Sequence, residues 1–284
     1  MLPFLPVALA AAPFTPSSVD EPAFVRRPLA VPAGPGANDL PVTTLCGSPD
    51  KNFIVEVNGG GLALGDFDSS GSLDLIVVDG STLERVAAEQ PGEAPRLYLN
   101  SGAGEFVSAG EAWSMTGGQW GMGCAAGDVD GDGHLDLMVT EWGPDRLFRN
   151  AGGEGFTEVT ERAGFKGRAW GTSAAFLDYD RDGNLDLAVV NYLAFRTDEI
   201  DSRETGACKW KGLPVMCGPE GLIPMHDRLY KGVGDGSFQD VSEESQTVMG
   251  RWAWASKFAD LNNDGWQDLV VANGYLTNED SGDL

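Results

Sequence analysis

The sequence predicts an all-β protein made of β-propeller blades, about four of them, arranged as a partial or open propeller. Three observations predict this fold. A ten-residue Asp-rich segment recurs four times, a short apolar run follows each copy, and 39 glycines among 284 residues supply many tight turns. A β-sandwich with accidental similarity is the alternative, but four in-register copies of one pattern argue against accident.

The Asp-rich segments align without gaps and begin at Asp66, Asp128, Asp178 and Asp260. The apolar runs that follow them cover residues 75–78, 137–140, 187–190 and 269–272. These runs are rich in β-branched residues and too short for helices, so we expect four buried strands. No stretch of the chain has a helical period, and helices should therefore be minor.

Two further landmarks recur around each Asp-rich segment. A tryptophan stands eight residues before the first Asp in three copies, at Trp120, Trp170 and Trp252, and Asn58 holds that place in the first copy. Downstream, an Arg-Leu-(Tyr/Phe) sequence, a Gly-rich turn and a Phe span residues 96–106, 146–156 and 228–238. Each span predicts a β-hairpin, so one repeat should hold four short strands, with the acidic loop between the first two.

The spacing of the acidic loop predicts a calcium site. Side chains at loop positions 1, 3 and 5 can turn inward, the Gly at position 6 permits a sharp bend, the backbone carbonyl of position 7 can join them, and position 9 adds a last Asp. The predicted ligands are Asp66, Asp68, Ser70, Ser72 and Asp74; Asp128, Asp130, Asp132, His134 and Asp136; Asp178, Asp180, Asp182, Asn184 and Asp186; and Asp260, Asn262, Asp264, Trp266 and Asp268. Soft transition metals prefer Cys or His, of which these loops hold one His in total.

The loop differs from an EF-hand, because position 12 is valine in all four copies and no helical pattern flanks it. We therefore expect the ion to clip a β-turn, with solvated acidic turns as the alternative. The second and third loops present four carboxylates each, whereas Ser70 and Asn262 replace one carboxylate in the first and fourth. Since ligand charge tunes affinity, the second and third sites should bind calcium most tightly. Four bound ions would change the formal charge from −24 to about −16.

The organisation along the chain indicates export. We expect a signal peptide at residues 1–13, a Pro- and Ala-rich lead-in at 14–45, and blades over 46–284 with the last blade incomplete. No apolar stretch reaches the length of a membrane span. The strongly acidic composition disfavours nucleic acid as a partner, because both would be negatively charged.

The four cysteines are Cys46, Cys124, Cys208 and Cys217. An even number in an exported chain favours disulfides, and the sequence allows three pairings. Cys208 and Cys217 lie close together in one irregular segment, so we expect that pair, which leaves Cys46 with Cys124. A zinc site is the rival, but the chain has no Cys-x-x-Cys.

The loops and their strands resemble FG-GAP/VCBS repeats, the blade units of the integrin α-subunit propeller. The chain from Cys46 onward resembles the narrower cartilage acidic protein (ASPIC/UnbV) type in the sequences of residues 59–63, 208–222, 227–230 and 234–238. The resemblance implies a secreted propeller, usually of seven blades, often followed by a small C-terminal domain. Because this chain has four loops and stops before the fourth hairpin, we expect an open arc truncated from a seven-bladed ring.

The expected function is a structural or recognition module, secreted, periplasmic or at the cell surface, that binds an extracellular protein, glycan or matrix. Trp210 and Lys211, in the insert around the third blade, are candidate anchors, or the insert merely covers a blade edge. The alternative is the propeller of a secreted enzyme, with its active site in the channel or in a further C-terminal part. Common nucleophile, zinc-protease and dinucleotide motifs are absent from the sequence, so we expect no catalysis. The oligomeric state stays open.

Overall fold

The computed structural model describes residues 44–102, 105–109, 113, 115–194, 196, 208–218, 222–248 and 253–273. Within these residues the helices are two short ones, η1 (Ile54–Val57) and α1 (Leu83–Ala87), and all other regular structure is strand. The predicted all-β class is confirmed. The expected signal peptide, most of the lead-in and Trp252 lie outside the described residues.

The strands form antiparallel units that follow the chain order, here named blades 1 to 4. Blade 1 contains β1 (Gly61–Gly65), β2 (Asp74–Val78), β3 (Arg96–Asn100) and β4 (Phe106–Ser108). Blade 2 contains β5 (Gly121–Gly127), β6 (Asp136–Gly143), β7 (Arg146–Asn150) and β8 (Phe156–Glu158). Blade 3 contains β9 (Ala169–Leu177), β10 (Asp186–Asn191), β13 (Arg228–Gly232) and β14 (Phe238–Asp240). Blade 4 contains β15 (Ala253–Ala259) and β16 (Asp268–Asn273) among the described residues.

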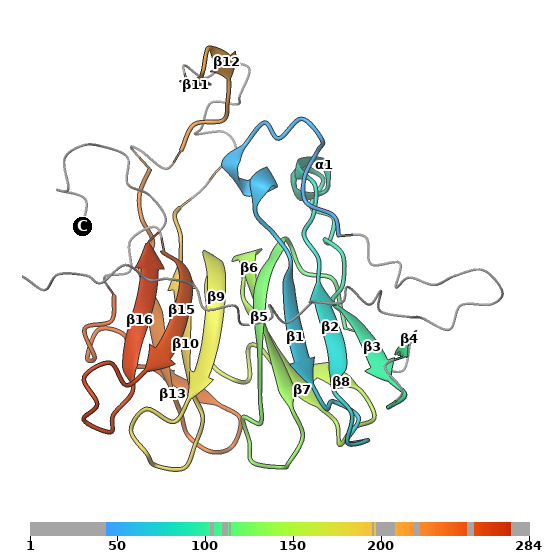
Figure 1. The fold of residues 1–284 in the computed structure, drawn as a ribbon, viewed down its shortest axis with the longest axis vertical. Helices are drawn as coiled ribbons and strands as arrows, with labels where there is room; N and C mark the ends of the chain where they lie inside the picture. The colour runs from blue at the N-terminus through green and yellow to red at the C-terminus, as the bar shows by residue number, and fades with distance from the viewer. Residues whose placement is uncertain are drawn as a thin grey trace, which may run out of the picture.

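The blades stand side by side as an arc, with the turns between their first and second strands all at one edge (Figure 1). We name this edge the loop edge, because it carries the Asp-rich segments. Helix α1 and the hairpin of β11 (Lys209–Trp210) and β12 (Leu213–Pro214) lie toward the other edge. Each predicted hairpin is present as β3–β4, β7–β8 or β13–β14. The repeat of four strands is therefore confirmed in blades 1 to 3.

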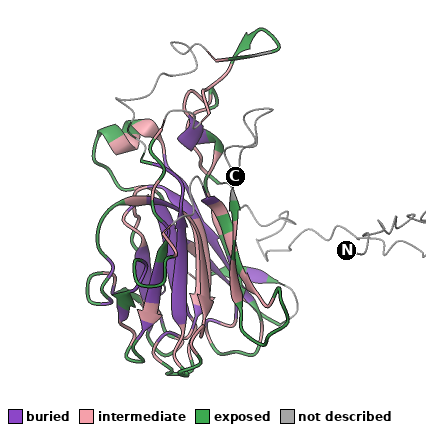
Figure 2. Cartoon of the chain, turned by 90° about the vertical axis from the view of Figure 1, so that its left-hand side faces the viewer, coloured by how far each residue is buried: buried purple, intermediate pink, exposed green. Residues whose placement is uncertain are grey.

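In blades 2 and 3 the second strand is apolar on both faces because each face packs toward a neighbouring blade. In blade 2, Leu137 and Val139 pack into the core shared with blade 1, whereas Met138 packs into the core shared with blade 3. All three side chains are fully buried. This arrangement explains the continuous apolar runs, since a strand exposed on one face would alternate polar and apolar residues. Figure 2 shows the buried residues gathered in the strands of the blades.

The fourth apolar run departs from the expectation of a buried strand. Val270 in β16 is 38% exposed, and its neighbour Leu269 is only partly buried. Within the described residues blade 4 has a neighbouring blade on one side only, so one face of β16 lacks the cover that β6 and β10 receive.

Glycines allow the first strands of adjacent blades to approach closely. A Cβ on Gly61 in β1 would lie 2.8 Å from the Cα of Gly123 in β5. A Cβ on Gly123 would lie 2.9 Å from the carbonyl oxygen of Thr172 in β9. Both distances are too short for any side chain, so these glycines set the packing of the first strands.

A row of aromatic rings connects the blades near the edge opposite the loops. Trp120 contacts Trp142, which contacts Trp170, which in turn contacts Tyr192, with ring centroids 5.8, 6.3 and 5.1 Å apart. Trp254 of blade 4 lies 4.2 Å from Tyr192. The recurring tryptophans at 120 and 170 are fully buried in this row, so they serve the core between blades.

The expected disulfide pairing is half right. Cys208 and Cys217 form a disulfide that closes the base of the β11–β12 hairpin. Cys46 and Cys124 are free thiols, and the expectation that they pair is wrong. Cys124 packs into the core between blades 1 and 2, whereas Cys46 packs beside the aromatic row, with its S–H within hydrogen-bonding distance of the Glu56 and Asn58 carbonyls. Burial raises the pKa of the Cys124 thiol to about 12, which keeps it protonated and unreactive.

Candidate metal centre

The four Asp-rich loops share one backbone conformation. Position 4 has a left-handed φ in every copy, at Ser69 (58°), Gly131 (71°), Arg181 (61°) and Asn263 (59°). Position 6 is also left-handed, with φ between 86° and 92°, and it is glycine in every copy: Gly71, Gly133, Gly183 and Gly265. A side chain is disfavoured in this region, so the invariant glycine is explained by the bend that it must make.

The carboxylates at positions 1 and 3 accept hydrogen bonds from the loop's own backbone. In loop 2, Asp128 accepts from the N–H groups of Asp132 (3.1 Å) and Gly133 (2.9 Å). Asp130 accepts from the N–H of Asp132 at 3.3 Å. The same bonds recur in the other three loops, with Asn262 accepting in place of an Asp in loop 4. The loops therefore hold these side chains in place through their own backbone.

Position 9 connects the loop to the rest of the blade. Asp136 is fully buried and accepts from the N–H groups of Val129 (2.9 Å) and Asn150 (2.8 Å), which joins the loop to the end of β7. Asp74 and Asp186 make the equivalent pair of bonds in loops 1 and 3. Burial, with a smaller contribution from the nearby carboxylates Asp130 and Asp132, raises the pKa of Asp136 to about 6. A bound cation would oppose both effects.

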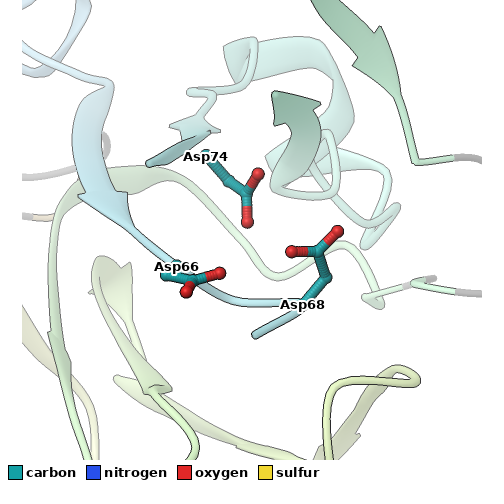
Figure 3. A group of neighbouring side chains, drawn as sticks. All are labelled: Asp66, Asp68 and Asp74. Carbon is teal, nitrogen blue, oxygen red and sulfur yellow. The ribbon is translucent and has the colours of Figure 1, made fainter. Parts of the chain in front are cut away.

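Three of the four loops bring three carboxylates together. The groups are Asp66, Asp68 and Asp74; Asp128, Asp130 and Asp136; and Asp178, Asp180 and Asp186, with one oxygen from each member of a group within 4.8 Å of the others. In Figure 3 the carboxylates of the first group point toward one another. This set of hard oxygen donors, spaced for one ion, fits calcium. In loop 4, Asn262 at position 3 leaves two carboxylates, Asp260 and Asp268, at the corresponding places.

The other predicted ligands are not part of these groups. At position 5, Asp132 and Asp182 are not members of the carboxylate groups of loops 2 and 3. The same position is Ser70 in loop 1 and Asp264 in loop 4. At position 7 the residues are Ser72, His134, Asn184 and Trp266, and the prediction concerns only their backbone carbonyls. Asp132 and Asp182 accept hydrogen bonds from the position 7 backbone N–H at 3.0 and 2.9 Å. Their ligand role stays a prediction.

The structure adds two residues that the sequence reasoning missed. Arg149 on β7 forms ion pairs with Asp130 and Asp132 of loop 2, the second at 3.1 Å. Lys231 on β13 forms ion pairs with positions 3 and 5 of loop 3 in the same way, at 2.9 Å for Asp182. Each cation follows directly after an Arg-Leu-(Tyr/Phe) sequence, and in blade 1 this place is Leu99. Among blades 1 to 3, the basic residue is therefore present in blades 2 and 3, whose loops have an Asp at position 5, and absent from blade 1, whose loop has Ser70 there.

Neighbouring loops also contact each other through positions 4 and 7. The Ser69 hydroxyl of loop 1 lies 3.1 Å from His134 Nδ1 of loop 2. The Arg181 guanidinium of loop 3 lies 4.0 Å from the centroid of the Trp266 ring in loop 4. Position 4 of loop 2 is Gly131, which has no side chain to make such a contact. The loops at this edge are therefore linked as two pairs.

Comparison with known proteins identifies the repeat. No curated protein matches the chain. Among solved structures, a lectin of Agrocybe aegerita, described as specifically recognising non-reducing terminal N-acetylglucosamine, matches with 18% identity and a TM-score of 0.33. The match covers 76% of this chain and 60% of the lectin chain, and at this similarity it carries no inference about function. The model of the FG-GAP-like repeat matches residues 66–139, 129–189 and 221–271, together more than half of the chain and including all four loops. This protein is therefore a member of the FG-GAP-like repeat family.

Proposed function

We propose that this chain is a calcium-stabilised extracellular recognition module without catalytic activity. The observation that carries the proposal is the convergence of loop positions 1, 3 and 9 in blades 1 to 3, in the same geometry each time. Repetition of one arrangement in three blades favours a structural ion over an active site, because a catalytic constellation would be needed only once.

The expected role of calcium follows from what each loop connects. Position 9 joins the loop to the third strand, and positions 1 and 3 hold the turn between the first and second strands. Without a cation, three carboxylates repel one another beside a buried strand end, which destabilises the folded blade. An ion that binds the folded chain alone would stabilise it by mass action, about 2.7 kcal/mol per site at a concentration about 100 times its Kd.

The location outside the cytoplasm is supported by two observations. FG-GAP-like repeats are typical of extracellular proteins, and the Cys208–Cys217 disulfide is stable in oxidising compartments. No helix in the described part of the chain is long and apolar enough to cross a membrane. The ASPIC/UnbV subtype is part of this proposal and rests on the sequence around the disulfide hairpin.

A thermal melt with and without calcium tests the proposal. We expect the Tm to rise by at least about 5 °C in 2 mM calcium relative to excess EDTA, and much less in magnesium, because these loops offer more oxygen ligands than magnesium takes from protein. Asp128→Asn should reduce the rise by removing one ligand charge. Glu154→Gln, which removes an exposed charge outside the loops, is the matched control and should leave the rise unchanged. Equal Tm values in calcium and EDTA would refute a structural calcium role.

A further inference from the structure

A cleft of about 1220 Å³ lies away from the loop edge. The connections that build it come from blades 1, 2 and 3: the segment after α1, the β6–β7 turn, the link from β8 to β9, and the ends of β10 and β13. A volume of this size accommodates a ligand larger than one sugar ring. None of the four Asp-rich loops contributes to it, so the cleft is separate from the candidate metal centre.

One ion pair of the repeat is broken in this cleft. Strand pairing makes Arg96, Arg146 and Arg228 equivalent, since each opposes the valine at position 12 of its loop. In blade 1, Arg96 pairs with Asp79 at 2.8 Å, and in blade 2, Arg146 pairs with Glu141 at 2.7 Å. The acidic partner always stands two residues after that valine. In blade 3 this place is Asn191, which has no charge, and both Asn191 and Arg228 line the cleft.

Asn191 leaves a buried hydrogen-bond acceptor at the cleft wall. Its backbone N–H donates to Asp227 at 2.8 Å, and its side-chain Nδ2 donates to the His226 carbonyl at 2.7 Å. The residue is 1% exposed, yet its Oδ1 accepts no hydrogen bond from any residue that the structure describes. An unsatisfied buried acceptor costs about 1–3 kcal/mol, so this oxygen favours a ligand that donates a hydrogen bond.

Arg228 has only a weak partner. Without an acid at position 191, it pairs with Asp240 at 2.5 Å, but its side chain is 45% exposed and that of Asp240 is 39% exposed. Exposed pairs of this kind contribute about 0–1 kcal/mol and are easily exchanged. In contrast, the Arg146 side chain of blade 2 is only 8% exposed. The third repeat therefore presents a guanidinium that the second repeat buries.

Two further basic residues line the same cleft as Arg228. Lys166 and Arg168, in the link between β8 and β9, are both exposed and line it. Lys166 forms no ion pair with any described residue, and Arg168 donates to the neutral side chain of Gln119. Five carboxylates also line the cleft, those of Glu89, Glu141, Asp145, Glu158 and Glu161. Glu141 and Glu158 pair with Arg146, and Asp145 accepts from the Glu141 N–H at 2.9 Å. The cleft therefore holds three exposed cations, Arg228, Lys166 and Arg168, among hydrogen-bond acceptors.

We propose that the cleft binds an acidic sugar, a glycan residue that carries a carboxylate. Arg228, Lys166 and Arg168 meet the carboxylate, and sugar hydroxyl groups donate to Asn191 Oδ1 and the cleft carboxylates. A guanidinium recognises a carboxylate through two parallel hydrogen bonds, which a neutral sugar cannot accept. This inference names the ligand of the recognition module and thus rests on the proposed function.

Saturation-transfer NMR in 2 mM calcium tests this assignment with two probes. Methyl β-glucuronide and methyl β-glucoside are matched, because they differ only in a carboxylate against a hydroxymethyl group. We expect the glucuronide to bind at least about tenfold more tightly, since a charged hydrogen bond contributes more than a neutral one. Arg228→Gln should lower glucuronide affinity about tenfold or more. Arg162→Gln, an exposed change outside the cleft lining, should leave it unchanged.

A second variant restores the pattern of the other blades. Asn191→Asp provides the acid that Arg228 lacks, so Arg228 should turn to it as Arg96 turns to Asp79, and glucuronide binding should be lost. A calcium-dependent Tm equal to that of the unchanged protein would show that the variant folds. Equal binding of both probes, or full binding by Arg228→Gln, would overturn the acidic-sugar assignment. If neither the glucuronide nor the glucoside binds, the assignment is also overturned. The calcium-dependent melt tests the proposed function separately.

Discussion

The two edges of the blades use the repeat in opposite ways. At the loop edge, four copies keep the same left-handed positions and the same backbone hydrogen bonds, although the side chains at positions 4, 5 and 7 vary. Toward the other edge, the three equivalent arginines have three different environments. Arg96 is half-buried and paired with Asp79, Arg146 is buried and paired with Glu141, and Arg228 is exposed and paired with Asp240.

The difference indicates which parts of a repeat are structural. An arrangement present in every blade stabilises every blade, so its loss should affect folding. An arrangement that one blade lacks is not needed for the fold, because that blade adopts the same fold as the others without it. Departures from a repeat are therefore good places to search for recognition.

The largest effect should come from position 9 at the loop edge. Asp136→Ala leaves two buried backbone N–H groups, those of Val129 and Asn150, without their acceptor. We expect a loss of about 2–5 kcal/mol in the free energy of unfolding, measured by urea denaturation in EDTA. Asp268→Ala in blade 4 is the matched change at a partly exposed position and should cost less. Equal losses would contradict the view that burial makes this Asp structural.

A middle-sized effect is expected from Asp145 in the cleft. Burial raises the pKa of Asp145 from 3.8 to about 7, so the folded protein holds a proton that the unfolded chain releases near pH 4. This stabilisation is complete below pH 4 and is lost as the pH rises through 7. Asp145→Asn can keep the bond from the Glu141 N–H and removes the titration. In saturating calcium the variant should gain about 1–2 kcal/mol over the unchanged protein between pH 6 and 8.

The control for this pH effect is Glu154→Gln, which removes an exposed carboxylate and should follow the unchanged protein at every pH. Chemical denaturation at each pH gives the free energies. A constant difference between Asp145→Asn and the unchanged protein from pH 6 to 8 would show that this carboxyl does not titrate in that range.

The smallest effect concerns the difference between loops at the same edge. Arg149→Leu gives loop 2 the residue that blade 1 has at Leu99. In EDTA the variant should be slightly less stable, because Asp130 and Asp132 lose their cation. Loop 2 of the variant should bind calcium roughly two- to fivefold more tightly, because the positive charge of Arg149 next to the ion is removed. Both changes enlarge the calcium-dependent rise in Tm.

Arg162→Gln is the charge-matched control for Arg149→Leu, since it also removes one positive charge. A smaller calcium response of Arg149→Leu would instead show that Arg149 supports the bound ion. The second and third loops each have four carboxylates, which favour calcium, but each also has a basic residue, Arg149 or Lys231, that opposes it. The prediction that these two sites bind calcium most tightly depends on which of the two effects is larger.

The sequence alone determined the repeat, the strand pattern and the loop chemistry of this protein. These are local properties: acidic side chains at alternate positions of a loop, a glycine where φ must be positive, and a continuous apolar run that can be buried on both faces. The tertiary structure decided what depends on partners distant in the chain. Cys46 and Cys124 are free because they pack into different cores, and Arg149 and Lys231 reach the loops across strand pairs. The exposure of Arg228 likewise follows from one uncharged residue on the neighbouring strand, and only the packed blades bring it into one cleft with Lys166 and Arg168.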